Sequence, residues 1–313
     1  MQLIAGRTDF VLERPCAAAI GKFDGIHRGH QALLANIREE KKKGLLSAVF
    51  TFDPAPAAFF SGTDGQELTT REEKRRIFNK LGIDVLIEFP LREDTAAIAP
   101  QTFIEEILVR RMKSAFVAAG TDVTFGRYGA GNSAMLTSYG NRLGFSVQII
   151  EKVCVGGREV SSSRIREELS AGHMEQVEEL IGFPYSVTGE VVHGKRLGRT
   201  IGMPTVNLAP PPGKLLPPFG VYFSEVSWKG KHFRSISNVG CKPTVSRERA
   251  VGVETYLYDF DQDIYGQEIT VKLLRFKRPE MKFGSVGELK AQARKDISEG
   301  AGAIVQTGGV IAN

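Results

Sequence analysis

The sequence predicts a two-domain α/β protein, in which a doubly wound parallel sheet is followed by a small antiparallel β-barrel and a closing helix. At 313 residues the chain is longer than one compact domain usually is. Up to Gly182, short apolar runs alternate with amphipathic helical segments, which is the pattern of parallel strands joined by helices. From Phe183 on, strand-like runs dominate, which is typical of a small barrel. We therefore expect domains at residues 1–183 and 184–313.

Apolar runs of strand length are expected to form the first sheet, and the first of them ends at Phe23. The runs are AAAIGKF, LLSAVFTF, DVLIEFP, AFVAAG and SVQIIEKV. Right-handed crossovers join such strands, and ligands of the resulting sheet bind at the carboxyl ends of the strands.

Two helices between these strands have recognisable ends. The first begins near His27 and stops at a lysine run, after which Gly44 can adopt the left-handed conformation. The second follows Thr69 and Glu72, which have the spacing of a capping box, and Gly82 closes it. These ends place one helix before the second strand and one after it.

The second half contains strand-like runs separated by turn signals such as Lys229-Gly230 and Tyr265-Gly266. The runs are YSVTGEVVHG, GVYFSEVSW, HFRSISNVG, VETYLYDF and EITVKLLRF. Residues 210–220 are too rich in proline for a central strand and are expected to form a loop. Ser285 and Glu288 predict the start of a final helix.

The composition argues against several classes of protein. Lys and Arg exceed Asp and Glu by only five, which suits an anionic small ligand and does not by itself indicate nucleic acid. Cys16, Cys154 and Cys241 lack the spacing of a zinc site or a disulfide framework and indicate reduced thiols. The sequence contains no recognisable targeting segment or membrane span. We expect a cytoplasmic protein with small-molecule partners and no nucleic-acid or membrane partner, and a homo-oligomer is left open.

The stretch GKFDGIHRGH, Gly21 to His30, concentrates groups that suit a phosphate. A spacing of three places His27 and His30 on one face in the first turn of a helix, where free N–H groups and the dipole favour an anion. Gly25 and Gly29 let a phosphate approach the main chain closely. Imidazoles, with a usual pKa near 6.5, add donors whose charge can respond to the ligand.

Such a site suits a reaction in which an anionic phosphate attacks the α-phosphorus of a nucleoside triphosphate. Positioning and neutralisation of charge are then the main catalytic tasks. The alternative is a pair of structural histidines, and the two glycines and Asp24 at the same junction favour the phosphate site.

Two further stretches carry groups for phosphate or metal. In VSSSRIREELSAG the serines can cap a helix and donate hydroxyls, and Arg164 or Arg166 offers a planar fork for phosphate oxygens. In GEVVHGKRLGRTIGMPTVNL a basic, glycine-rich loop can wrap phosphates, and Thr205 and Asn207 face the same way with oxygens that suit Mg2+. Glu254 can accept a proton from an alcohol that attacks the γ-phosphorus of ATP. A capped helix, a solvated loop and a surface strand residue are the alternatives.

GKFDGIHRGH resembles the H-x-G-H signature of nucleotidylyltransferases, in the form found in the bacterial riboflavin kinase/FMN adenylyltransferase family, also called FAD synthetases. VSSSRIREELSAG is similar to the second motif of that family. The resemblance implies a Rossmann-like first domain of the nucleotidylyltransferase type, with catalytic His27 and His30. It implies that flavin contacts Asp53, Asp122 and Phe125. The residues implied to bind ATP and its phosphates are Gly21, Phe23, Asp24, Gly25, Ser162, Ser163, Arg164 and Arg166.

Two positions depart from the pattern of this family. TFDPAP has Ala55 where a histidine is usual, and GTDVTFGRYGAGN has Val123 where an aromatic residue is usual. Because the resemblance implies that these loops hold flavin and nucleotide, a weakened adenylyltransferase is left open.

The second half resembles a riboflavin kinase module, with GKRLGRTIGMPTVN, a proline-rich loop, FGVY, SNVGCKPT and VETYL in the same order. The resemblance implies a riboflavin kinase type of barrel, in which Thr205 and Asn207 hold Mg2+-ATP and Glu254 is the base at the ribityl 5′-hydroxyl. Residues implied to border the flavin are Arg278, Glu280 and Phe283. The loop implied to close over the phosphates contains Gly194, Lys195, Arg196, Gly198 and Arg199.

The likeness runs from Ala18 to about Asp296 and implies two reactions in the synthesis of FAD. The barrel would phosphorylate riboflavin to FMN with ATP, and the sheet domain would transfer AMP from ATP to FMN, with Mg2+ as the cofactor. Three alternatives stay open: a riboflavin kinase with an inactive adenylyltransferase domain, a nucleotidylyltransferase for another phosphate acceptor, and a flavin-binding regulatory protein without catalysis.

Overall fold

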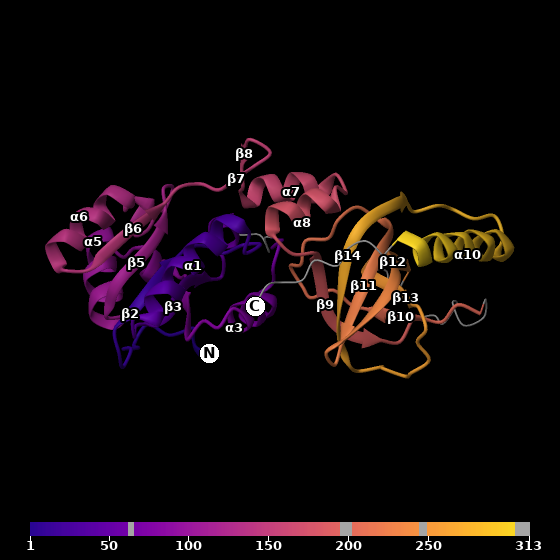
Figure 1. Ribbon diagram of the computed structural model, residues 1–313, viewed down its shortest axis with the longest axis horizontal. Coiled ribbons are helices and arrows are strands. Elements are labelled where there is room, and N and C mark those ends of the chain that lie inside the picture. The colour runs from indigo at the N-terminus through magenta and orange to yellow at the C-terminus, as the bar shows by residue number, and fades with distance from the viewer. Residues whose placement is uncertain (62–65, 195–201, 244–248, 304–313) are drawn as a thin grey trace. The chain divides into compact units, whose positions relative to one another are not determined.

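The computed structural model describes residues 1–61, 66–194, 202–243 and 249–303 (Figure 1). The chain divides into two compact units, Met1–Ser162 and Ser163–Asn313. Helices α7 (Ser162–Ser170) and α8 (Met174–Ile181) lie almost wholly in the second unit by this division. The domain boundary expected after residue 183 stays a prediction.

The first unit is built on a six-stranded parallel sheet with the order β1-β4-β3-β2-β5-β6. The five runs predicted from the sequence form β2 to β6, and the structure adds β1 at one edge. The strands are β1 (Gln2–Ala5), β2 (Cys16–Ile20), β3 (Leu46–Asp53), β4 (Val85–Pro90), β5 (Ser114–Gly120) and β6 (Ser146–Ile150). The chain runs from β2 through β3 to β4 and then returns to the other side of β2, so the strand order reverses between β2 and β5.

Both faces of this sheet are buried by helices. Ala18 and Ile20 of β2 belong to a core with η1 (Phe103–Arg111), a π-helical segment, and α6 (Ser133–Leu143). Ala17 and Ala19 belong to a second core with α1 (Arg28–Lys42) and α3 (Arg71–Lys80). Figure 1 shows α6 and α1 on opposite sides of β5. Buried side chains on both faces explain why these strands are continuous apolar runs in the sequence.

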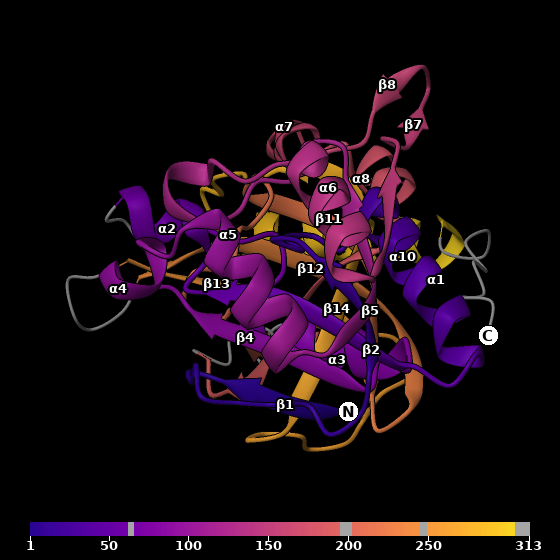
Figure 2. The same ribbon diagram turned by 90° about the vertical axis from the view of Figure 1, so that its left-hand side faces the viewer.

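Short elements complete the unit. They are α2 (Pro56–Ser61), α4 (Glu93–Ala96), α5 (Pro100–Thr102), the 3-10 turn η2 (Arg127–Gly129), β7 (Cys154–Val155) and β8 (Arg158–Glu159). Figure 2 shows the β7–β8 hairpin projecting away from the six-stranded sheet.

The expected end of the first strand is wrong by three residues. Strand β2 ends at Ile20, and Phe23 has a φ of 51°. Gly25 and Ile26 also have positive φ values, 84° and 42°. A strand cannot contain such angles, so the chain leaves the sheet at Gly21 and makes a tight turn before α1.

The expected capping box is wrong by one residue. Helix α3 has Thr70 as its N-cap, and the reciprocal bonds join Thr70 and Glu73. The side chain of Thr69 is engaged elsewhere, because its hydroxyl oxygen accepts a hydrogen bond from the backbone N–H of Gly25 at 2.9 Å. The positive φ values of Gly44 (100°) and Gly82 (73°) confirm the two glycine helix ends.

The second unit is a closed antiparallel barrel with the order β10-β13-β12-β11-β14-β9, which confirms the predicted fold class. The hydroxyl of Ser285 accepts from the N–H of Glu288, which confirms the predicted start of α10. The expected loop lies between β10 and β11, except that its last residue, Gly220, begins β11. The elements are β9 (Tyr185–Val192), β10 (Thr205–Leu208), β11 (Gly220–Trp228), β12 (Lys231–Pro243), β13 (Arg249–Leu257), β14 (Glu268–Pro279) and α10 (Val286–Ala303).

Hydroxyl groups on the inner side of the barrel form hydrogen bonds with one another. Ser224 lies 2.8 Å from both Ser235 and Ser237, and Ser237 lies 2.8 Å from Thr255. All four side chains are buried. Residues that alternate with Ser237 and Thr255 along β12 and β13 therefore point to the opposite face. Within the described parts of the chain, no helix has both the length and the apolar character needed to span a bilayer.

Thr70→Ala is expected to lower the unfolding free energy of the first unit by about 1 kcal/mol, because it removes the N-cap of α3. Urea unfolding followed by circular dichroism measures this loss. The fluorescence of Trp228, the one tryptophan and a residue of the barrel strand β11, reports the second unit as a control. Thr70→Ser is expected to behave as the wild type, and an unchanged stability for Thr70→Ala would contradict the assigned cap.

Candidate active sites

The turn after β2 lies at the point where the strand order reverses. It carries His27 and His30, while Asp122 follows the end of β5 on the other side of the reversal. In open α/β sheets this is where ligands bind. Two non-glycine residues of the turn, Phe23 and Ile26, have positive φ, a strained conformation that is concentrated at functional sites.

The two histidines are stacked on each other at the start of α1. Their ring centroids are 3.8 Å apart with an interplanar angle of 22°. His27 is the N-cap, and its Nδ1 accepts from the backbone N–H of His30 at 3.4 Å, which leaves its Nε2 as the donor. Nδ1 of His30 is buried and has no hydrogen-bond partner among the described residues. The stack thus contains one buried ring nitrogen that the described part of the chain leaves without a partner.

Burial keeps both imidazoles neutral. It lowers the pKa of His27 to about 4, against a smaller opposing effect of Asp24 and Asp122. Burial also lowers the pKa of His30 well below its usual value, and the charges of His27 and Lys74 act in the same direction. The usual pKa near 6.5, on which the expected response of their charge to a ligand was based, therefore does not apply to the ligand-free protein, since desolvation disfavours the imidazolium.

Asp24 holds the turn in place. Its carboxylate accepts from the N–H groups of Leu68 at 2.8 Å and Thr69 at 3.4 Å. Its backbone carbonyl accepts from the hydroxyl of Ser162 at 2.9 Å. An anionic group that already binds two N–H donors suits this shaping of the turn better than contact with a phosphate. A β-carbon at Gly25 would approach Leu68 to 3.1 Å, and Gly25 has a positive φ, so glycine fits best there.

The residues implied to contact flavin lie in different environments. Asp53 forms an ion pair with Arg71 at 3.1 Å, and Asp122 is exposed and lies 3.7 Å from Lys152. Phe125 is buried in the core, where its ring packs on Phe103 with centroids 5.3 Å apart. The structure therefore does not bring the ring of Phe125 to the surface of the site.

The serine and arginine motif forms the first turns of α7, as the sequence suggested. Ser162 begins the helix, Ser163 is exposed, and Arg164 and Arg166 are half-buried. Ser162 belongs to the first unit, and the residues after it belong to the second unit.

The barrel aligns three polar side chains across neighbouring strands. Asn207 of β10 pairs with Glu254 of β13, and Glu254 pairs with Asn238 of β12. Thr205 donates a hydrogen bond to the carboxylate of Glu254 at 2.6 Å, which confirms that Thr205 and Asn207 share one face with this carboxylate. Asn238 was not predicted, because it is brought into this row by the register of β12.

Gly194 lies directly against this row. A β-carbon at Gly194 would collide with the side-chain amide of Asn207. Of the predicted phosphate loop, Lys195, Arg196, Gly198 and Arg199 lie outside the described residues. The close approach of the backbone at Gly194 explains why the loop begins with a glycine.

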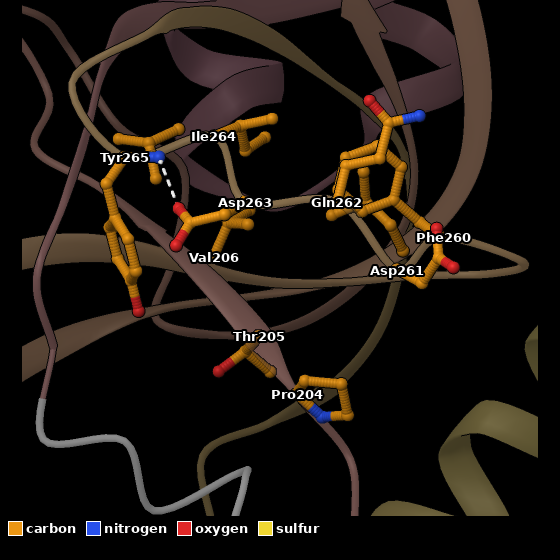
Figure 3. Close-up of a pocket in the computed structure, with 11 residues that line it drawn as sticks. Pro204, Thr205, Val206, Phe260, Asp261, Gln262, Asp263, Ile264 and Tyr265 are labelled. Carbon is orange, nitrogen blue, oxygen red and sulfur yellow. Dashed lines mark hydrogen bonds between the residues drawn. The ribbon is translucent and has the colours of Figure 1, made fainter.

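A cavity of about 440 Å³ opens beside Thr205. It lies between β10 and the loop at residues 260–265, as Figure 3 shows. Tyr265 lines it, and the backbone N–H of this residue donates to Asp263 at 3.2 Å. Phe260 adds a second aromatic ring. Neither aromatic residue was predicted to line a site, because the sequence shows only a turn signal at Tyr265-Gly266 and a strand-like run that ends at Phe260.

The residues implied to border the flavin in the barrel have partners of their own. Arg278 is bound by Asp296 of α10 at 2.6 Å, and Lys277 contacts the same carboxylate at 3.1 Å. Glu280 accepts from the side chain of Asn238 at 3.3 Å. Phe283 is half-buried in the segment between β14 and α10. Glu280 is therefore connected through Asn238 to the row that contains Glu254.

The oxygens in this row fit Mg2+ better than a softer metal. Thr205 and Asn207 offer neutral oxygens on one face, and Glu254 adds a carboxylate within hydrogen-bond distance of Thr205. Mg2+ prefers oxygen ligands and commonly keeps few protein ligands beside water and nucleotide phosphates. The donor set thus agrees with the cation that the sequence implied.

Comparisons with known proteins match both units. The family model of FAD synthetase matches residues 10–164, and that of riboflavin kinase matches residues 181–303. The bifunctional riboflavin kinase/FMN adenylyltransferase of Listeria monocytogenes is 36% identical over 89% of this chain and 89% of its own. The protein of the same description from Escherichia coli K12 is 37% identical over 90% of each chain. The crystal structure of a macrolide-efflux protein from Streptococcus pneumoniae covers 96% of this chain and 99% of its own, with a TM-score of 0.87 and 28% identity.

In the ligand-free protein His27 is expected to titrate at about 4. Histidines in an unfolded chain titrate near 6.5, so between about pH 6.5 and 4 the unfolded chain binds more protons than the folded one. The free energy of unfolding of the first unit therefore decreases as the pH is lowered through this range. Histidine NMR across this range measures the pKa. Asp122→Asn is expected to lower it further, because the exposed Asp122 raises the pKa of His27. A pKa near 6.5 for His27 would contradict the burial of its ring.

Proposed function

The chain belongs to the family of bifunctional riboflavin kinases/FMN adenylyltransferases, and we propose that it makes FAD in two steps at two separate sites. The barrel phosphorylates riboflavin to FMN, and the sheet domain adenylylates FMN. The observation that carries this function is the presence of both family matches, each on a unit with a group of polar side chains suited to its reaction. We assign the first reaction to residues 184–313 and the second to residues 1–183.

For adenylylation we propose that His27 and His30 contact the reacting phosphates. A phosphate oxygen of FMN forms a bond to the α-phosphorus of ATP while the bond to pyrophosphate breaks. FMN is already an anion, so no base is required, and neutral imidazoles serve as donors to the charge that develops on the phosphorus oxygens. Ser162, Ser163, Arg164 and Arg166 are proposed to bind the leaving pyrophosphate portion.

For phosphorylation we propose that Glu254 accepts the proton of the ribityl 5′-hydroxyl. The hydroxyl oxygen forms a bond to the γ-phosphorus of ATP while the bond from that phosphorus to the leaving ADP breaks. The hydrogen bond from Thr205 holds one oxygen of this carboxylate and orients it. Thr205 and Asn207 are the residues that would hold Mg2+, which neutralises charge on the phosphates when bound. The cavity beside Thr205 suits the base of ATP, because Tyr265 and Phe260 offer aromatic surface.

The remaining roles are also proposals. Asp53 and Asp122 are assigned to the flavin of the adenylylation site, and Arg278, Glu280 and Phe283 to that of the kinase site. We propose a cytoplasmic location, which suits a chain in which all three cysteines are unpaired thiols. We propose no nucleic-acid or membrane partner.

A single assay tests the function and its nearest alternative. Riboflavin and Mg-ATP are supplied, and FMN and FAD are separated by chromatography over time. We expect FMN first and FAD after it. Accumulation of FMN without FAD would select a kinase whose adenylyltransferase domain is inactive, an outcome that Ala55 and Val123 would then explain.

His30→Ala is expected to lower FAD formation by about two orders of magnitude, because it removes one donor to the reacting phosphate. FMN formation in the same variant is expected to stay near normal, which shows that the chain is folded. His232→Ala, which removes an exposed histidine of the β11–β12 hairpin, is the matched control. Equal loss of both activities in His30→Ala would rule out two separate sites.

Glu254→Gln is expected to lower riboflavin phosphorylation by at least about two orders of magnitude, because it removes the base but keeps the volume of the side chain. Adenylylation of supplied FMN is expected to be unchanged. Glu190→Gln on β9, a strand that pairs with β10 and β14 but not with β13, removes an exposed carboxylate and serves as control. Full kinase activity in Glu254→Gln would remove this residue from the mechanism.

A further inference from the structure

Lys74 is a buried cation beside the stacked histidines that neither proposed reaction uses. Its side chain is 8% exposed. One turn further along α3, Phe78 is fully buried and packs edge-to-face on Phe23, with ring centroids 5.5 Å apart. Phe23 also packs on His30, with centroids 5.0 Å apart. Because positions four apart share a helix face, Lys74 projects from the side of α3 that covers these rings.

The charge of Lys74 is only partly balanced. Its ammonium donates to a carboxylate oxygen of Glu67 at 3.0 Å, and that is its one ion pair among the described residues. An ammonium has three N–H donors, so Glu67 leaves two of them without an acceptor among the described residues. Glu67 is more exposed than Lys74, at 22% against 8%, so water screens the carboxylate more than the ammonium. Glu67 therefore offsets the positive charge of Lys74 only in part.

This field acts on His30. The charge of Lys74 lowers the pKa of His30, after the larger effect of burial and together with His27. From the other elements around the pair, the charged groups are Asp24 in the turn and Asp122 after β5, and both raise the pKa of His27. The charge of Lys74 therefore acts on the histidine pair in the opposite direction to these two carboxylates, since it lowers a pKa that they would raise.

We propose that Lys74 is a positioning residue of the adenylylation site, which acts through His30 by holding a positive charge behind the stacked imidazoles. The inference rests on the proposed FMN adenylyltransferase activity. Negative charge grows on the oxygens of the α-phosphorus as the new bond to FMN forms and the bond to pyrophosphate breaks. A fixed, desolvated positive charge stabilises it without reorientation during the reaction. The same charge keeps His30 from taking up a proton, so its ring keeps both a donor and an acceptor nitrogen.

The decisive experiment compares Lys74→Met, Lys74→Arg and Glu67→Gln in the full chain. Histidine NMR of the ligand-free protein gives the pKa of His30, and steady-state rates with FMN and ATP give kcat and KM for FAD formation. In Lys74→Met the pKa of His30 is expected to rise, because a nearby positive charge is lost. We expect kcat to fall roughly tenfold, less than for loss of a donor in contact with the phosphate, with both KM values little changed, since Lys74 does not touch substrate.

The other two variants make the result specific to charge. Lys74→Arg is expected to keep the pKa of His30 and most of kcat. Glu67→Gln removes the carboxylate that offsets Lys74, so the pKa of His30 is expected to move in the opposite direction to that in Lys74→Met. A lysine that only stabilised the fold would not produce shifts of opposite sign.

Lys41→Met is the matched control. Lys41 also forms an ion pair, with Asp84 at 2.8 Å, but it lies near the far end of α1, about 16 Å from His30 along the helix axis. Neither the pKa of His30 nor kcat is expected to change in this variant, and riboflavin phosphorylation reports folding in every variant.

Two outcomes overturn the inference. One is an unchanged pKa of His30 in Lys74→Met, even if FAD formation falls, because the lysine would then act on structure alone. The other is an unchanged pKa of His30 in Glu67→Gln. This second outcome decides whether Lys74 acts on His30 if Lys74→Met does not fold. If the wild type makes no FAD, the proposed function fails, and the NMR titration still tells separately whether Lys74 acts on His30.

Discussion

The carboxylate of Asp24 is the constraint on which the first site depends. It joins the turn after β2 to the N–H groups of Leu68 and Thr69, directly before the cap of α3. The hydroxyl of Thr69 returns a second bond to the N–H of Gly25. Because α3 starts from this junction, the place of its buried face relative to His30 follows from the same few hydrogen bonds. A single half-buried acid thus orders the imidazoles and the helix that covers them.

The side chains of the two sites are held in position in different ways. In the sheet domain the groups come from a turn with positive φ angles and from a helix start, and burial keeps the imidazoles uncharged. In the barrel they come from adjacent strands, where hydrogen-bond register alone aligns Asn207, Glu254 and Asn238. Neutral donors suit transfer between two anions, whereas a carboxylate suits an attacking alcohol that must lose a proton.

Most of the fold could be predicted because helix and strand periods are local properties of the chain. The errors arose where a distant contact replaced a local one. Thr69 has the spacing of a cap, but its hydroxyl is held by Gly25, so Thr70 caps α3 instead. The strand was extended to Phe23 because the residue is apolar, although its backbone already turns. The ring of Phe125, which the resemblance implied to contact flavin, packs in the core, and its contact with flavin stays a prediction.

The sequence by itself determined the kinds of element, the helical spacing of His27 and His30, and the alternation that puts Thr205 and Asn207 on one face. These follow from bonds between residues a few positions apart. Only the tertiary structure decided that the imidazoles are neutral, that the charge of Lys74 lowers the pKa of His30 and that Asn238 joins the row of Glu254. Burial, electric field and strand register depend on which distant segments pack together, and no local pattern contains that information.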